Sequence, residues 1–95
     1  MTAEHNATDL PELIEKAVLS CPSVARLDRG QYGTVASYLP GRQVVGVSVG
    51  ERVEVAVVLR LATPVPVAVN DIRARVRDVA GDLPVDVTVA DLADE

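Results

Sequence analysis

The sequence predicts an α+β fold, a two-layer sandwich in which a small mixed β-sheet of three to five strands is covered on one face by two helices. Two segments carry apolar residues at the three- and four-residue spacing of a helix, and several shorter ones alternate apolar and polar residues as strands do. The chain contains no phenylalanine or tryptophan, so its valine-rich core consists of small branched side chains, which favour strands. The predicted order of elements is α-β-β-β-α-β.

Residues 9–90 are expected to form a single domain. A chain of 95 residues is near the lower limit for folding on one hydrophobic core, and a composition of 48% hydrophobic and 24% charged residues is typical of a globular chain. Residues 1–8 are polar and show no periodicity, so we expect a disordered lead there. The acidic residues 91–95 are expected to form a frayed tail.

The first helix is predicted to run from the capping box of Asp9 and Glu12 to about Ser20. Pro22 disfavours helical geometry at the residue before it, so the helix should end there. One buried face is formed by Leu10, Leu13, Ile14, Ala17, Val18 and Cys21.

Short strands are predicted next. Residues 24–27 form one candidate, followed by a turn at residues 28–30, and residues 33–39 either extend it or form a second strand before Pro40 and Gly41. Residues 45–49 and 53–61 then alternate on either side of Gly50-Glu51-Arg52, which predicts a hairpin. The longer strand has one fully apolar face and one mixed face, so one side should be covered and the other at least partly wet.

Two prolines mark a corner between this strand and a second helix. Pro64 cannot donate to a sheet, and Pro66 suits the first position of a helix. An alternative start places Asn70 at the N-cap. The buried stripe is expected to contain Val65, Val69, Ile72, Val76 and Val79. After Gly81, the alternating residues 85–89 predict a closing strand parallel to the long one, with a right-handed crossover.

The charge and the cysteine count limit the classes of function. A net charge of −5 disfavours nucleic acid as a partner, and the absence of an apolar run near 18 residues predicts no direct membrane insertion. The N-terminus has neither a basic flank nor an apolar segment, so we expect no signal peptide. A single cysteine, Cys21, fits a reducing compartment, so a cytoplasmic location is expected.

No residues are predicted to be catalytic, to bind a cofactor or to hold a metal. Cys21 is the only thiol and His5 the only imidazole, whereas nucleophilic and zinc sites need several such groups at defined spacings. Asp71, Arg75 and Asp78 lie on one side of the second helix, where they are interpreted as a solvated charge ladder.

Two surfaces are predicted to bind a protein partner. Arg73 and Arg77 share one flank of the second helix. The glycine-containing loop carries Tyr38, Gly41 and Arg42; the tyrosine is expected to cover the core edge, and the glycine and arginine could instead cradle an anion.

The order of these segments resembles the alkaline-shock/general-stress family of small bacterial envelope-stress proteins. The resemblance lies in PSVARL, the alternating VEVAVVLRL, the corner and helix PVPVAVNDIRARVRDVAG and the closing VDVTVAD, and VASYLPGRQVVGVSV is similar to the loop of short members from high-GC bacteria. It implies a non-enzymatic, stress-linked interaction or scaffold protein in the cytoplasm, recruited to the membrane by an anchored protein partner.

Two alternatives to a membrane-anchored partner follow from the residues. The partner is a second copy of the chain, in a homo-oligomer, or the domain is regulatory and binds an anionic metabolite at Gly41 and Arg42.

Overall fold

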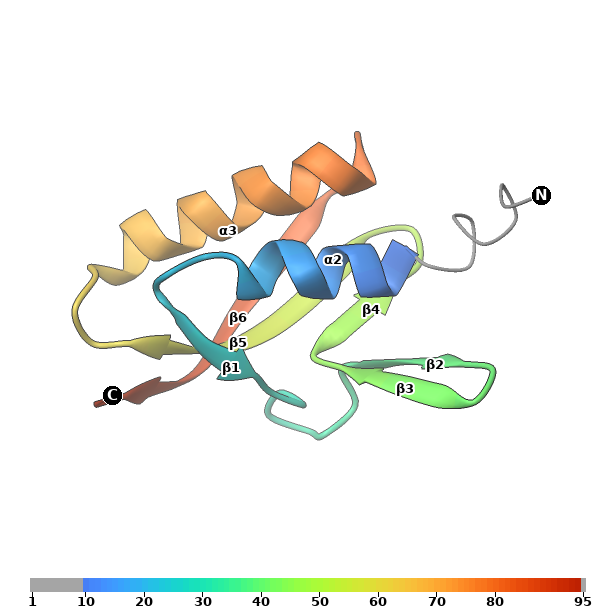
Figure 1. Cartoon of the computed structure of the whole chain (residues 1–95), viewed down its shortest axis with the longest axis horizontal. Coiled ribbons are helices and arrows are strands. Elements are labelled where there is room, and N and C mark those ends of the chain that lie inside the picture. Colours follow the sequence, from blue (N-terminus) through green and yellow to red (C-terminus); the bar gives the residue numbers. More distant parts are fainter. Residues whose placement is uncertain (1–9, 95) are drawn as a thin grey trace.

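The computed structural model describes residues 10–94 and confirms the α+β class, with both helices on one face of the main sheet (Figure 1). The prediction of a disordered lead and the cap at Asp9 lie outside the described residues. The elements in chain order are α2 (Leu10–Leu19), β1 (Val24–Leu27), β2 (Ala36–Leu39), β3 (Arg42–Val45), β4 (Val47–Val49), β5 (Val53–Arg60), α3 (Val65–Ala80) and β6 (Val85–Ala93).

Strand β5 is the centre of a four-stranded sheet. β6 runs parallel along one of its edges, and β4 and β1 pair antiparallel with it, β4 at residues 53–55 and β1 at residues 57–59. The two short strands therefore share the second edge of β5 end to end. The change from one to the other occurs at Ala56, whose N–H donates to Gly46 and whose carbonyl accepts the N–H of Asp28.

Gly46 interrupts the strand predicted over residues 45–49, because Val45 ends β3 and β4 begins at Val47. Its φ is +87°, and a Cβ there would lie 2.7 Å from the Cβ of Leu27. The chain bends at this glycine, so β3 leaves the main sheet and pairs with β2 in a separate two-stranded sheet. Residues 24–39, whose strand count the sequence left open, thus form two strands in two different sheets.

The core lies between the main sheet and the helices. Val53, Val55, Val57 and Leu59 of β5 belong to one buried cluster with Ile14 and Val18 of α2 and with Ala68, Ile72 and Val76 of α3.

The predicted stripe of α3 was wrong at its ends. Ala68 is buried, whereas Val65 and Val79 are 37% and 38% exposed. Both valines lie in the terminal turns of α3, which are less covered than its middle. The corner at Pro64 is confirmed, and because α3 begins at Val65 the alternative start at Asn70 is excluded.

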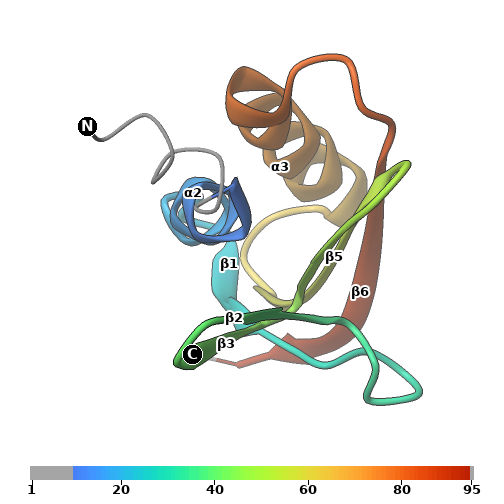
Figure 2. The ribbon, with the colours of Figure 1, turned by 90° about the vertical axis from the view of Figure 1, so that its right-hand side faces the viewer.

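The second face of the sheet is partly exposed, as expected, since Glu54, Asp86 and Thr88 are exposed there, but part of it is buried. Ala56 and Val58 of β5 are 0% and 1% exposed. The loop of residues 28–35 crosses below the sheet (Figure 2), and a Cβ at Gly30 would lie 3.8 Å from that of Ala56. The chain itself therefore covers part of this face.

Strand β6 continues beyond its predicted end. Leu92 pairs with Leu59 and Ala93 with Arg60, after a shift in register that leaves Ala90 unpaired. The expected frayed tail was therefore wrong for residues 91–93, because β5 extends to Arg60 and offers backbone partners along its whole length.

Candidate functional site

The predicted loop surface is the β2–β3 hairpin. Gly41 occupies its turn with a φ of +79°, and Tyr38 is 75% exposed, so the expectation that this tyrosine covers the core edge was wrong. The guanidinium of Arg42 forms ion pairs with Glu12 and Glu15 of α2. An anion at this loop would meet two carboxylates, so the geometry disfavours the anionic-metabolite hypothesis and assigns Arg42 to the attachment of the hairpin to α2.

The two arginines predicted on α3 have different surroundings. The Nε of Arg73 donates to the backbone carbonyl of Val85, 3.3 Å away, at the start of β6. Arg77 is exposed, and its backbone carbonyl accepts the N–H of Gly81. The β2–β3 hairpin contacts α2, whereas Arg73 contacts β6. The predicted residues therefore lie on two separate surfaces.

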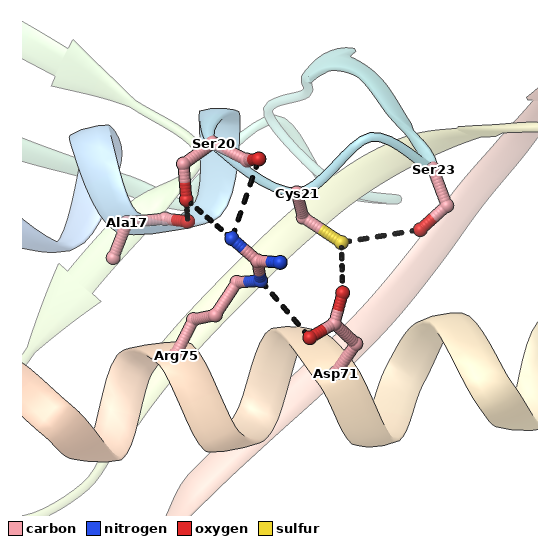
Figure 3. Close-up of polar contacts among 6 residues, drawn as sticks. All are labelled: Ala17, Ser20, Cys21, Ser23, Asp71 and Arg75. Atoms are coloured by element: carbon pink, nitrogen blue, oxygen red, sulfur yellow. Dashed lines mark hydrogen bonds and ion pairs between the residues drawn. The ribbon is translucent and has the colours of Figure 1, made fainter.

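A polar network that sequence reasoning missed joins the end of α2 to α3 (Figure 3). Asp71 accepts a hydrogen bond from the Nε of Arg75 at 2.9 Å and another from the thiol of Cys21 at 3.0 Å. The Nη1 of Arg75 also donates to the hydroxyl oxygen of Ser20 at 2.9 Å. The i,i+4 spacing of Asp71 and Arg75 was a signal in the sequence, but nothing there indicated the contact with Cys21.

The charges of this network suit a structural role. The hydrogen bonds from Cys21 and then from Arg75 lower the pKa of Asp71, against an opposing effect of burial. The hydrogen bond to Asp71 raises the pKa of Arg75. Both groups are therefore charged at neutral pH, and neither is poised to exchange a proton.

The backbone of β6 has an outer edge that faces away from β5. The N–H of Val53 donates to the carbonyl of Pro84, and in a parallel ladder successive residues of one strand direct their backbone groups to opposite sides. The backbone N–H and C=O groups of residues 86 and 88 therefore point toward β5. Those of Val85, Val87 and Val89 point away from it. Figure 2 shows β6 as the outermost strand on this side.

Side chains occupy both ends of this outer edge. Arg73 binds the carbonyl of Val85, and the Oδ1 of Asp91 accepts the N–H of Leu92 at 2.8 Å. Between these two contacts, the N–H and C=O groups of Val87 and Val89 meet no partner among residues 10–94. We call this stretch, residues 85–92 of β6, the β6 edge.

The two sides of the β6 edge differ in chemistry. Toward the helices, Val87 and Val89 are half-buried and Leu92 is 45% exposed, although their β5 neighbours are fully buried. The core is therefore incompletely covered along this strand. On the opposite side, Asp86, Thr88 and Asp91 are exposed.

A cleft of about 340 Å³ opens on this polar side, between the loop of residues 28–35 and the two neighbouring strands. Tyr32, Glu54, Asp86 and Thr88 contribute to its wall. Glu54 and Asp86 are register partners on β5 and β6, and Asp86 also forms a 2.9 Å ion pair with Arg52. Of these two carboxylates, only Asp86 has an ion-pair partner among residues 10–94.

In comparisons with known proteins, no family model, curated protein or solved structure matches the chain. The inference about function therefore rests on the fold and on the β6 edge. Over residues 10–94, neither helix combines the length and the apolar character needed to span a bilayer.

Proposed function

We propose that this chain is a non-enzymatic interaction or scaffold protein of the envelope-stress type, and that the β6 edge binds its protein partner. One observation carries the proposal: Val87 and Val89 present outward backbone donors and acceptors that no described residue binds. Such a row of groups pairs readily with a strand from another chain.

The sequence of β6 supports this use. Edge strands are commonly protected from pairing by proline, by lysine or by an early bulge. Val85–Ala93 contains neither proline nor lysine, and its irregularity comes only after Val89. The first five residues of the strand are thus regular, and the outward backbone groups of Val87 and Val89 are accessible to a partner.

The partner that the resemblance implies is a membrane-anchored protein. A net charge of −5 is consistent with recruitment by such a partner rather than by direct contact with anionic lipid. The protein then acts on the cytoplasmic side of the membrane as a non-catalytic component of the assembly.

Affinity capture of tagged protein from its native cells, after gentle membrane solubilisation, tests this proposal. The wild type should retain one dominant membrane-anchored protein at comparable abundance, and Val87→Pro should lose it. Proline removes the outward N–H of residue 87 and leaves the ladder to β5 intact, because that ladder uses the neighbouring residues. Val87→Thr, which keeps the N–H, is the matched control and should retain the partner.

Circular dichroism and thermal unfolding of both variants establish that they are folded. Equal capture by folded Val87→Pro would rule out the β6 edge as the binding surface. Recovery of the bait alone, from the soluble fraction, would contradict membrane recruitment.

A further inference from the structure

We propose that the segment docking on the β6 edge is an extended strand in which basic residues alternate with apolar ones. This inference rests on the proposed use of the β6 edge. It names the chemistry of the partner, and it follows from the different character of the two sides of β6.

Side chains of an added strand would alternate between the two faces of the sheet, as those of β6 do. Those on the helix side would lie against Val87, Val89 and Leu92, which the fold leaves incompletely buried. Apolar residues at these positions would remove that surface from water and extend the core by one strand.

Side chains on the opposite side would meet an acidic surface. Glu54 and Asp91 form no ion pair with another described residue, and Asp86 forms an ion pair only with Arg52. Opposite charges on neighbouring strands stabilise their pairing. Lysine or arginine is therefore the residue type that this side accepts.

The cavities beside β6 give these basic side chains a place to lie. The cleft walled by Tyr32, Glu54 and Asp86 is followed along the strand by a second one of about 310 Å³, which Asp28, Thr88 and other residues line. Thr88 belongs to both walls, so the two clefts adjoin. They suit two cationic side chains separated by one residue, and the ring of Tyr32 offers a cation–π contact to one of them.

A second copy of this chain fits the same edge poorly. Its β6 would bring the same apolar row but also the same aspartates, and each chain carries a net charge of −5. Like charges on paired strands are destabilising. The free stretch is also short, since Arg73 and Asp91 occupy its two ends, so the matching segment spans roughly five residues.

Labelled nine-residue peptides provide the test, with binding to the full chain measured by fluorescence anisotropy. One peptide alternates lysine with valine, a second has the same composition with its lysines contiguous, and a third alternates glutamate with valine. The alternating basic peptide should bind about tenfold more tightly than either of the others. Its affinity should fall as salt is added. Comparable binding of the acidic or the contiguous peptide would overturn the proposal.

A pair of charge variants locates the contact. Glu54→Gln/Asp86→Asn should weaken binding of the alternating basic peptide about fivefold. Asp78→Asn/Asp82→Asn, which makes the same change of charge at the end of α3, should leave it unaltered. Amide resonances of Val87 and Val89 should shift on binding more than that of Thr88, because Thr88 directs its N–H to β5. Equal affinity of the two double variants for the alternating basic peptide would contradict the proposal that the partner segment carries basic residues.

The same variants separate this inference from the proposed function. If Val87→Pro abolishes capture of the cellular partner while Glu54→Gln/Asp86→Asn does not, the edge binds a partner but the partner is not basic. If Val87→Pro affects neither the capture nor peptide binding, the proposed function of the β6 edge fails as well. Concentration-dependent dimerisation that Val87→Pro abolishes would instead identify a second copy as the occupant.

Discussion

At the scale of single residues, Gly46 determines how the β segment is divided. Its positive φ is a conformation that other residues adopt only at a cost, and the Cβ of Leu27 and the carbonyl of Asp28 approach it too closely for a side chain. The same residue contributes the carbonyl that binds Ala56 at the junction of β4 and β1. Gly46 thus lets the β2–β3 hairpin leave the main sheet, and its carbonyl provides the backbone hydrogen bond to β5 between β4 and β1.

Three glycine-to-alanine variants separate these effects. Gly41 has a positive φ but open space around it, and Gly50 has open space and no positive φ. We expect Gly50→Ala to leave the free energy of unfolding nearly unchanged and Gly41→Ala to lower it by about 1–2 kcal/mol. Gly46→Ala adds overpacking and should cost about 3 kcal/mol or more. Chemical denaturation measures all three, and equal losses for residues 41 and 46 would show that the close approach at Gly46 is unimportant.

The contact between the two helices depends on a small number of polar groups. Cys21 lies two residues beyond the end of α2 and is buried, as its apolar spacing predicts, but its thiol also donates to Asp71 of α3. Arg75 extends the contact to Ser20. An i,i+4 pair that resembles an ordinary surface pair therefore holds the C-terminus of one helix against the middle of the other.

The ionisation of Asp71 should make this helix contact dependent on pH. Its pKa is lower in the folded than in the unfolded chain, so the ionised carboxylate stabilises the fold above the ordinary value of 3.8. That contribution is lost as the pH falls through the lowered pKa. The melting temperature of wild type should thus exceed that of Asp71→Asn at about pH 7 and 5, and the difference should shrink below about pH 4.

Cys21→Ala is the companion variant for this measurement. It removes the largest cause of the lowered pKa of Asp71. At neutral pH, the difference in melting temperature between Cys21→Ala and Cys21→Ala/Asp71→Asn should therefore be smaller than that between wild type and Asp71→Asn. A melting difference that stays constant between about pH 7 and 3 would contradict the assignment of Asp71 as an ionised hydrogen-bond acceptor.

At the scale of the whole molecule, charged side chains connect parts that are distant along the chain. Arg42 joins the β2–β3 hairpin to α2, and Arg73 joins α3 to β6. Both had been predicted as partner-binding residues. Arg42 is exposed and Arg73 is half-buried, and their charged groups already form contacts within the fold.

Arg42→Ala should loosen the hairpin with little effect on global stability. The Arg42 side chain is 45% exposed, and exposed ion pairs contribute about 0.5–1 kcal/mol. The loss in the free energy of unfolding should be of this size at low salt and should diminish at high salt. Amide exchange should accelerate at Ser37 and Val44, which form a hydrogen-bonded pair across the hairpin, more than along β5. A salt-independent loss of more than about 2 kcal/mol would contradict the peripheral role.

The sequence by itself determined the α+β class, both helices, the proline corner and the hairpin between β4 and β5. These features depend on periodicity, proline chemistry and turn residues, which act over a few neighbours and are therefore visible in a linear chain. The alternation of Val85, Val87 and Val89 also predicted β6 correctly up to its regular end.

Only the tertiary structure decided which surfaces are available. Whether Arg42 and Arg73 are free depends on α2 and β6, which meet them across long stretches of chain. The contact of Cys21 with Asp71 joins residues fifty positions apart. The open edge of β6 likewise follows from the order of strands, because an alternating strand reads the same whether a neighbour pairs with one of its edges or with both.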